Sequence, residues 1–273
     1  MLKTTLALIL VICFAVNSYG DVVFDMDQKE PGTGTTGRSE GKVKGKNIRL
    51  DYYRKGDVPD GSMVFRGDQG KLIMINHEDK TYIVLDEAAM EALGSRMDQV
   101  MSQMEEALKD VPPEKRDMVR KMMKERMPGT AWGEAQELQI KKAGSGKVDG
   151  YSCTKYDIYK GDEKTMQHCV APWDKIDGGS EMKSAMLGMG DFMDQMAEKF
   201  SRSSSIAGPG VQSERNMFKQ LRKLDGFPVQ TIIYAQDKAV GESNLVSSKE
   251  ETVDPAAFEP PPGYSLQTID TGQ

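Results

Sequence analysis

The stretch from Gly70 to Met90 places two unbroken apolar runs on either side of a short polar turn. Leu72–Ile75 and Tyr82–Leu85 are typical of the two strands of a β-hairpin, and residues 76–80 form the turn. A strand that buries only one face alternates apolar and polar side chains, whereas these two strands have no polar face. The hairpin must therefore be covered on both sides, or one side must border a cavity for an apolar ligand. We expect a cover of methionine-rich helices that encloses such a cavity.

Other parts of the chain alternate in the same extended manner and are joined by tight turns. The predicted strands, besides the hairpin, are residues 22–26, 44–54, 61–67, 135–142, 151–159, 164–170, 228–236 and 241–252. Helical patterns interrupt this series. The simplest arrangement is an α+β fold in which helices pack on one face of an antiparallel sheet.

Three stretches carry apolar residues every three or four positions, which predicts amphipathic helices over residues 86–108, 114–127 and 181–200. Asp86 is the expected N-cap of the first helix. Most of the 19 methionines lie in these stretches. They allow three interpretations: packing of a filled core, an adaptable lining for an apolar ligand or hydrophobic partner, and thioether ligands for Cu(I).

The N-terminal residues 1–20 have the pattern of a signal peptide, with Lys3, an apolar run and a small-residue cleavage site at Gly20. The apolar run of about 11 residues is too short to span a membrane. Leu10–Ile12 before Cys13 does not suit a lipoprotein cleavage site. Residues 21–273 then form one exported domain, in which 31–46 and 201–213 are expected to be flexible loops.

The net charge of −6, without a cluster of Lys or Arg, argues against a nucleic acid or an anionic membrane surface as the partner. No apolar run elsewhere approaches the length of a transmembrane segment. We therefore expect a soluble protein of the periplasm.

Cys153 and Cys169 remain after removal of the signal peptide, and a disulfide between them is expected in an oxidising compartment. They lie on two predicted strands around Gly161. A loop of odd length centred on this glycine places the two cysteines directly opposite each other. Closing a loop of about 15 residues contributes roughly 3 kcal/mol.

The sequence contains no recognisable catalytic constellation. Its two histidines, His77 and His168, have no adjacent nucleophile and no metal-ligand spacing, and the motifs of hydrolases, metalloproteases and phosphate-binding loops are missing. The carboxylates are scattered along polar helix faces. We expect a protein that is not an enzyme and that has neither a cofactor nor a metal.

Several short motifs resemble an exported family labelled "domain of unknown function 4412". They are Gly61–Leu85 with the methionine-rich helix after it, Val148–Tyr156, Gly226–Gln230 and the ending Phe258–Tyr264, which is similar to a Phe…Pro-x-Gly-Tyr close. That family resembles the lipoprotein-carrier (LolA/LolB-like) architecture. The resemblance implies a curved antiparallel sheet, an incomplete barrel, with methionine-rich helices on its concave face and a cavity for acyl chains.

The predicted function is a non-enzymatic periplasmic binding protein for an apolar or lipid-like ligand or a hydrophobic partner, such as a lipid or a lipidated protein. The alternatives are an interaction module with a filled core and a Cu(I)-handling protein. The sequence names neither the ligand nor the oligomeric state. The candidate lining residues are Ile73, Ile75, Ile83, Leu85, Met90, Met97, Met101, Met104, Met186, Met189 and Met193.

Overall fold

The computed structural model describes residues 20–30, 36–109, 111–112, 115–116, 138–203 and 222–267. Its helices are α1 (Glu87–Lys109) and α3 (Gly179–Ser203), with short 3-10 helices η1 (Trp173–Lys175) and η2 (Pro255–Phe258). None of these helices is both long and apolar enough to cross a membrane. The strands are β1 (Val22–Lys29), β2 (Thr36–Lys44), β3 (Asn47–Tyr53), β4 (Gly61–Arg66), β5 (Lys71–Asn76), β6 (Thr81–Leu85), β7 (Leu138–Val148), β8 (Tyr151–Lys160), β9 (Glu163–Ala171), β10 (Phe227–Ala235), β11 (Lys238–Glu250) and β12 (Ser265–Leu266).

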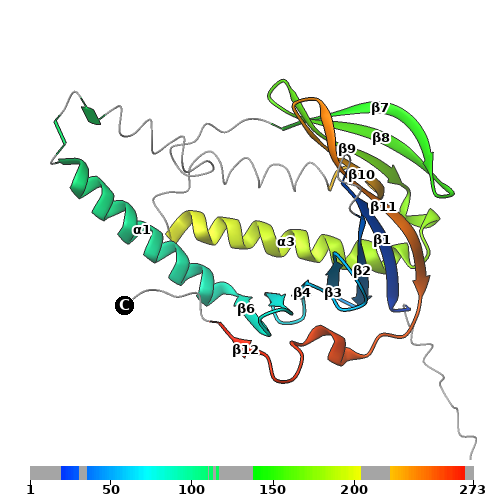
Figure 1. The fold of residues 1–273 in the computed structure, drawn as a ribbon, viewed down its shortest axis with the longest axis horizontal. Helices are drawn as coiled ribbons and strands as arrows, with labels where there is room; N and C mark the ends of the chain where they lie inside the picture. Colours follow the sequence, from blue (N-terminus) through cyan, green and yellow to red (C-terminus); the bar gives the residue numbers. More distant parts are fainter. Residues whose placement is uncertain are drawn as a thin grey trace, which may run out of the picture.

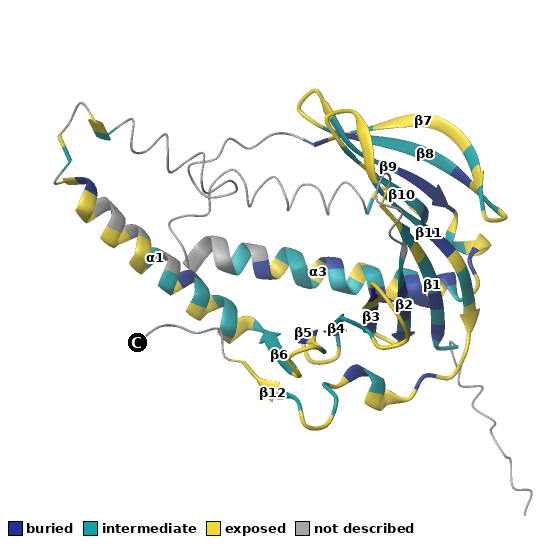
Figure 2. Ribbon diagram, in the orientation of Figure 1, coloured by how far each residue is buried: buried dark blue, intermediate teal, exposed yellow. Residues whose placement is uncertain are grey.

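All twelve described strands belong to one sheet, in the order β12-β6-β5-β4-β3-β2-β1-β11-β10-β9-β8-β7. Neighbouring strands run antiparallel except β12, which pairs with β6 in parallel. The sheet is strongly curved, and its edge strands β12 and β7 do not meet, so it stays open (Figure 1). Figure 2 shows that most of the edge strand β7 is exposed. This curved, unclosed sheet fits the incomplete barrel expected from the sequence.

The prediction of a flexible loop over residues 31–46 is wrong for residues 36–44, because these form strand β2 between β1 and β3. Gly41 lies under the ring of Phe24, where a β-carbon would overlap the ring atoms. The side of β2 that faces the Phe24 ring therefore needs a small residue at this position. The charged residues Arg38 and Glu40 lie on the opposite face of the strand. Small and charged residues give no apolar alternation, which is why the pattern looked like a loop.

Strands β5 and β6 form the expected hairpin, with Leu72 opposite Leu85. One face of this hairpin contributes both leucines to the main hydrophobic cluster. Helix α3 covers the cluster: its Met182 is fully buried there, and its Phe192 ring lies 5.3 Å from the ring of Phe65 on β4. A helix is therefore the cover on this side of the hairpin.

The opposite face of the hairpin is covered by residues 251–267, which we call the C-terminal segment (Figure 1). Ile73 and Ile75 form a second hydrophobic cluster there with Val253 and Phe258. Phe258 is only 1% exposed, and the segment ends by adding β12 to the edge of β6. The sequence had led us to expect helices as the cover, and this second cover is instead an extended chain with one 3-10 turn.

Helix α1 begins at Glu87, as predicted, because the Asp86 carboxylate accepts a hydrogen bond from the backbone N–H of Ala89 at 2.9 Å. It packs against α3, and Lys199 of α3 forms an ion pair with Glu87. The predicted helix over residues 114–127 lies outside the described residues except for 115–116.

Helix α3 extends three residues beyond the predicted end at residue 200. It therefore occupies the first three positions of the flexible loop that we predicted over 201–213. The rest of that loop, 204–213, lies outside the described residues, as do residues 1–19 of the predicted signal peptide.

Cys153 on β8 and Cys169 on β9 are joined in a disulfide, the pairing expected from the sequence. The predicted register is wrong, because Cys169 lies opposite Lys155 and the disulfide runs diagonally between the strands. The hairpin turns at Gly161 through a two-residue loop, and Thr165 is an unpaired bulge residue that shifts the register. The cysteines still share a face because they differ from the opposed pair by two positions.

Replacing both cysteines, Cys153→Ala with Cys169→Ala, should lower the free energy of unfolding by about 3 kcal/mol, because the disulfide constrains a long loop in the unfolded chain. Urea unfolding of the oxidised protein and the double variant measures this difference. The reduced wild-type protein is the control and should match the variant. Equal stability of the oxidised protein and the variant would contradict the prediction.

Phe258→Ala should lower the free energy of unfolding by about 3–5 kcal/mol, because it leaves a cavity over the second face of the hairpin. Leu266→Ala is the matched control in the same segment, since Leu266 is 53% exposed, and it should change stability by less than about 0.5 kcal/mol. Urea unfolding distinguishes the two variants. Similar small losses in both would mean that the C-terminal segment does not seal the hairpin.

Candidate functional site

An apolar pocket of about 250 Å³ lies between α3, strands β9 and β10, and the turn at residues 222–226. We call it the methionine pocket, because α3 contributes Met186, Met189 and Met193 to its wall. These positions are three and four residues apart and therefore share one face of the helix. The rest of the apolar wall comes from Val170, Trp173, Leu187, Leu224 and Pro228.

Two ion-paired groups border the methionine pocket. Lys183 donates to Asp225 at 2.7 Å. Arg222 donates to Asp191 at 2.5 Å and also pairs with Asp194. Both cations therefore already have carboxylate partners before any ligand arrives.

Because Gly190 has no side chain, it leaves room for Arg222 to lie across α3. A β-carbon at this glycine would come within 3.3 Å of the arginine Nε, so a larger residue would press on the side chain. Arg222 Nε and Asp194 Oδ1 are both buried without a hydrogen-bond partner. Because these two atoms belong to the same ion pair, a small shift to a bidentate pairing would satisfy both.

His168 is the buried polar residue of the pocket, at 8% exposure. Its Nδ1 is 2.9 Å from Oγ1 of Thr231 on the neighbouring strand β10. Burial lowers the pKa of His168 to about 4, so the ring is neutral at physiological pH. The pocket thus contains a buried, neutral imidazole, whereas its charged lining residues Lys183, Arg222 and Asp225 keep part of their side chains exposed.

The structure separates the predicted hairpin residues from the methionines. Leu85 contacts the main cluster under α3, and Ile83 is half-buried on the same strand. Ile73 and Ile75 lie on the opposite face, beneath the C-terminal segment. Successive side chains of a strand point to opposite faces, so an unbroken apolar run cannot line one cavity. None of these four residues lines the methionine pocket.

Of the predicted residues on α1, Met90 is half-buried in the first turns of the helix. The side chains of Met97, Met101 and Met104 lie outside the described residues. The sequence reasoning missed Val170, Trp173 and Pro228, because their place in the wall depends on how β9 and β10 meet α3.

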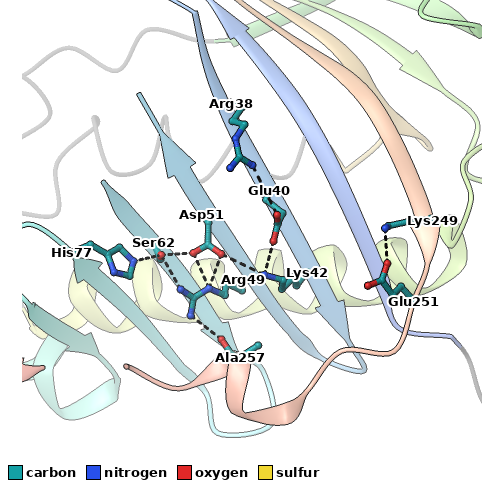
Figure 3. A network of polar contacts seen from close by, with 10 residues as sticks. All are labelled: Arg38, Glu40, Lys42, Arg49, Asp51, Ser62, His77, Lys249, Glu251 and Ala257. Carbon is teal, nitrogen blue, oxygen red and sulfur yellow. Dashed lines mark hydrogen bonds and ion pairs between the residues drawn. The ribbon is translucent and has the colours of Figure 1, made fainter. Parts of the chain in front are cut away.

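A buried polar network lies under the C-terminal segment (Figure 3). Arg49 is at its centre and donates to both carboxylate oxygens of Asp51, at 2.7 and 2.9 Å. The same guanidinium donates to Ser62 Oγ at 3.1 Å and to the backbone oxygen of Ala257 at 2.8 Å. Arg49 thereby ties strands β3 and β4 to the C-terminal segment, and each of its three nitrogens donates to an acceptor.

His77 extends this network to the end of the segment. Ser62 Oγ has one proton, and its contact with Asp51 uses it, because an ionised carboxylate only accepts. His77 Nε2, 2.6 Å from Ser62, must then be the donor, and Nδ1 accepts from the Tyr264 hydroxyl at 2.9 Å. Burial and the nearby Arg49 lower the pKa of His77, which agrees with this neutral tautomer.

The network contains the residue types of a hydrolase triad in an order that does not activate serine. In a triad the histidine lies between serine and aspartate, whereas here Ser62 lies between Asp51 and His77. Ser62 is also buried, so a substrate has no access to its hydroxyl. The geometry therefore suits attachment of the C-terminal segment rather than nucleophilic catalysis.

A second, larger groove of about 740 Å³ lies at the ends of strands β1, β3, β10 and β11. Tyr52, Ile233 and Val240 give it an apolar part, but charged residues such as Arg54 and Glu242 also line it. The methionine pocket is the better candidate for an apolar ligand because its wall holds fewer charges. In the described part of the chain, no three His, Cys, Asp or Glu side chains are grouped as metal ligands.

The two histidines should make stability depend on pH between about 6.5 and 4. Each has a lower pKa folded than unfolded, so the unfolded chain binds more protons in this range and the free energy of unfolding falls as the pH drops. His168 contributes about 3 kcal/mol of this loss. Urea unfolding at pH 7 and pH 4.5 measures it.

His168→Gln should flatten this pH dependence, while His77→Gln should leave the larger part of it in place. Carboxylates with a lowered pKa, such as Asp68, add to the loss of stability below about pH 5, but they do so equally in the wild type and in both variants. The same loss of stability with falling pH in His168→Gln as in wild type would show that His168 is not held neutral by burial.

No family model matches the chain, and no curated protein matches it. Among solved structures, it is similar to an uncharacterized conserved protein from Thermus thermophilus, with 6% identity, a TM-score of 0.45, and coverage of 92% of this chain and 91% of that chain. It is also similar to the Pseudomonas aeruginosa MucA/MucB complex, with 7% identity, a TM-score of 0.36, and coverage of 88% and 55%. MucB in complex with MucA(peri) gives 7% identity, a TM-score of 0.36, and coverage of 92% and 57%. The chain thus spans little more than half of the MucB structures, and the resemblance to the exported family stays a prediction.

Proposed function

We propose that this chain is an exported, non-enzymatic binding protein that takes an apolar or lipid-like ligand into the methionine pocket. The observation that carries the proposal is the composition of the pocket wall. Three thioether side chains from α3 face Val170 and Pro228 of the sheet around an unfilled volume of about 250 Å³. Ligand pockets are typically concave and mostly apolar with a few polar groups, as this one is.

Methionine suits such a pocket better than a branched aliphatic residue. The methionine side chain is unbranched and polarizable, so the same residues can repack around ligands of different shape. Met182, on the same helix, is fully buried in the main cluster and supplies ordinary packing. α3 therefore has two roles in the proposal: Met182 and Phe192 seal the sheet, while Met186 and Met189 both pack against the main cluster and line the pocket.

We place the methionine-rich helices on the concave side of the curved sheet. The contacts of α3 with β2 and β3, and of Phe192 with Phe65, support this placement for α3. The placement of α1 rests on its packing against α3 and β6. A ligand between helix and sheet is then shielded from water by both layers.

The exported location rests on the predicted signal peptide and on the Cys153–Cys169 disulfide, which favours an oxidising compartment. The absence of catalysis is part of the proposal and is supported by the buried, carboxylate-bound Ser62. The neutral His168 contacts Thr231 and has no carboxylate partner among the described residues, unlike the histidine of a triad.

Native mass spectrometry of the mature protein, purified without detergent, tests the proposal directly. A bound organic mass would support it and identify the ligand. A protein without a ligand that also takes up no apolar dye would contradict it and favour an interaction module with a filled core. A bound metal mass would favour Cu(I) handling instead.

Met186→Gln with Met189→Gln should weaken uptake of an apolar fluorescent dye about tenfold or more, because two amides replace apolar wall. Met74→Gln is the matched control. Met74 is 42% exposed on β5 and does not line the methionine pocket, so this variant should bind the dye as the wild type does. Unchanged dye binding in the folded double variant would place the ligand elsewhere.

A further inference from the structure

We infer that the methionine pocket and the larger groove at the strand ends are two parts of one binding site. Its ligand is an elongated amphiphile, with an apolar chain in the pocket and a polar part carrying hydroxyl or carbonyl groups in the groove. The inference rests on the proposed function, because it names the class of ligand for the same pocket and adds a second part to the site. Neutral and charged amphiphiles both belong to this class.

The two cavities border the same face of the sheet. Val170 and His168 on β9 line the methionine pocket and are two positions apart, so their side chains point to the same face. Thr231 on β10 lies directly opposite His168, shares its face and lines the groove. His168 Nδ1 is 2.9 Å from Thr231 Oγ1. One hydrogen-bonded cross-strand pair thus forms the boundary between the pocket and the groove.

Uncharged polar side chains continue from this boundary across the sheet. Thr231 lies opposite Ser243 on β11, and Ser243 lies opposite Gln28 on β1, so the three side chains share one face. All three line the groove, and we call them the polar row. The strands β9, β10, β11 and β1 are neighbours in the sheet (Figure 1). From His168 to Gln28 the row crosses three strand separations, or about 14 Å.

The chemistry of the two cavities matches the two parts of an amphiphile. The methionine pocket has an apolar wall, and its volume of about 250 Å³ is below the roughly 300–1,000 Å³ typical of ligand sites. The groove adds about 740 Å³, which brings the combined site into that range. The hydroxyl and amide groups of the polar row both donate and accept hydrogen bonds, as a ligand carbonyl or hydroxyl requires.

The groove also exposes large apolar side chains beside the polar row. Ile233 follows Thr231 by two positions on β10 and is 48% exposed. Val240 on β11 and Tyr52 on β3 are 44% and 39% exposed and line the same groove. Exposed apolar side chains that gather in one place mark binding surfaces. They extend the apolar contact available to a ligand that leaves the methionine pocket.

The charged residues of the groove do not interrupt the polar row. Arg54 donates to Asp60 at 3.0 Å just outside strands β3 and β4. Glu242 accepts hydrogen bonds from the side-chain amides of Gln230 and Asn244. These groups are therefore engaged with each other, and the three members of the polar row carry no charge.

Displacement of Nile red by 1-decanol and by 1-monodecanoylglycerol tests the inference, since the probes share a chain length and differ by a glyceryl ester. We expect monodecanoylglycerol to bind at least about fivefold more tightly, because its ester and hydroxyls reach the polar row. Equal or weaker binding of monodecanoylglycerol would overturn the inference and leave the proposed function standing. If neither probe displaces the dye, the inference and the proposed function both fail.

Gln28→Leu with Ser243→Val removes hydrogen-bonding groups of the polar row and leaves the His168–Thr231 pair in place. Monodecanoylglycerol should bind about five- to tenfold more weakly to this variant, whereas 1-decanol should not be weakened. Ser152→Val, at an exposed position of β8 that lines neither cavity, is the matched control and should change neither probe. An equal loss for both probes, or no loss for monodecanoylglycerol, would overturn the inference.

Met186→Gln with Met189→Gln distinguishes one continuous site from two separate ones. Both probes should bind more weakly to this variant, because the chain of each lies in the methionine pocket. Weakening of 1-decanol alone would show that monodecanoylglycerol binds in the groove independently, and the inference of a single site would be wrong.

Discussion

The fold depends on the burial of strands β4–β6 from both sides. The hairpin of β5 and β6 has no polar face that could be exposed to water. A cover on one side alone, as in a simple two-layer structure, would therefore leave an apolar face exposed. Helix α3 closes one face, and the C-terminal segment returns from β11 to close the other and to extend the sheet at β6. Residues far apart in the sequence must come into contact, as Ile73 and Phe258 do, to bury the second face of the hairpin. Contacts of such long range slow folding, because closing the intervening chain costs entropy.

The polar network around Arg49 fixes where the C-terminal segment lies. Apolar contacts at Phe258 favour burial but specify position poorly, because hydrophobic attraction has no direction. Arg49 is held in a plane by Asp51 and presents its remaining donors to Ser62 and to the backbone of Ala257. A buried ion pair contributes little net stability, since its desolvation offsets the attraction, and its value lies in the geometry it imposes. Burial of Phe258 thus stabilises the C-terminal segment, and the hydrogen bonds of Arg49 fix its position.

Much of this arrangement follows from the sequence, and the parts that do not have specific causes. The doubly apolar runs, the cap at Asp86 and the cysteine pair predicted a hairpin, a helix start and a disulfide that the structure contains. Strand β2 was missed because Gly41 makes room for a distant ring, which no local pattern reveals. The register of the cysteine hairpin was wrong because a single bulge at Thr165 has no distinct sequence signal. For the candidate site, helical spacing placed the three methionines on one face, but the opposing wall is set by how β9 and β10 meet α3.

The two covers of the hairpin differ in chemistry, and this difference is consistent with the proposed binding role of the α3 side. On the C-terminal side, the hydrogen bond from Arg49 to Ala257 is directional and the Phe258 ring is only 1% exposed. Together they fix a single arrangement of the C-terminal segment. On the α3 side, thioether and aliphatic groups make up most of the pocket wall and have no preferred direction, while the ion pairs of Lys183 and Arg222 border it. A pocket that binds ligands of different shape needs a rigid framework on one side and adaptable side chains on the other. The C-terminal segment covers one face of the hairpin and α3 covers the other, while the methionine pocket lies elsewhere along α3, between this helix and strands β9 and β10. His168, on the sheet side of the pocket, stays neutral because burial disfavours the charged imidazolium.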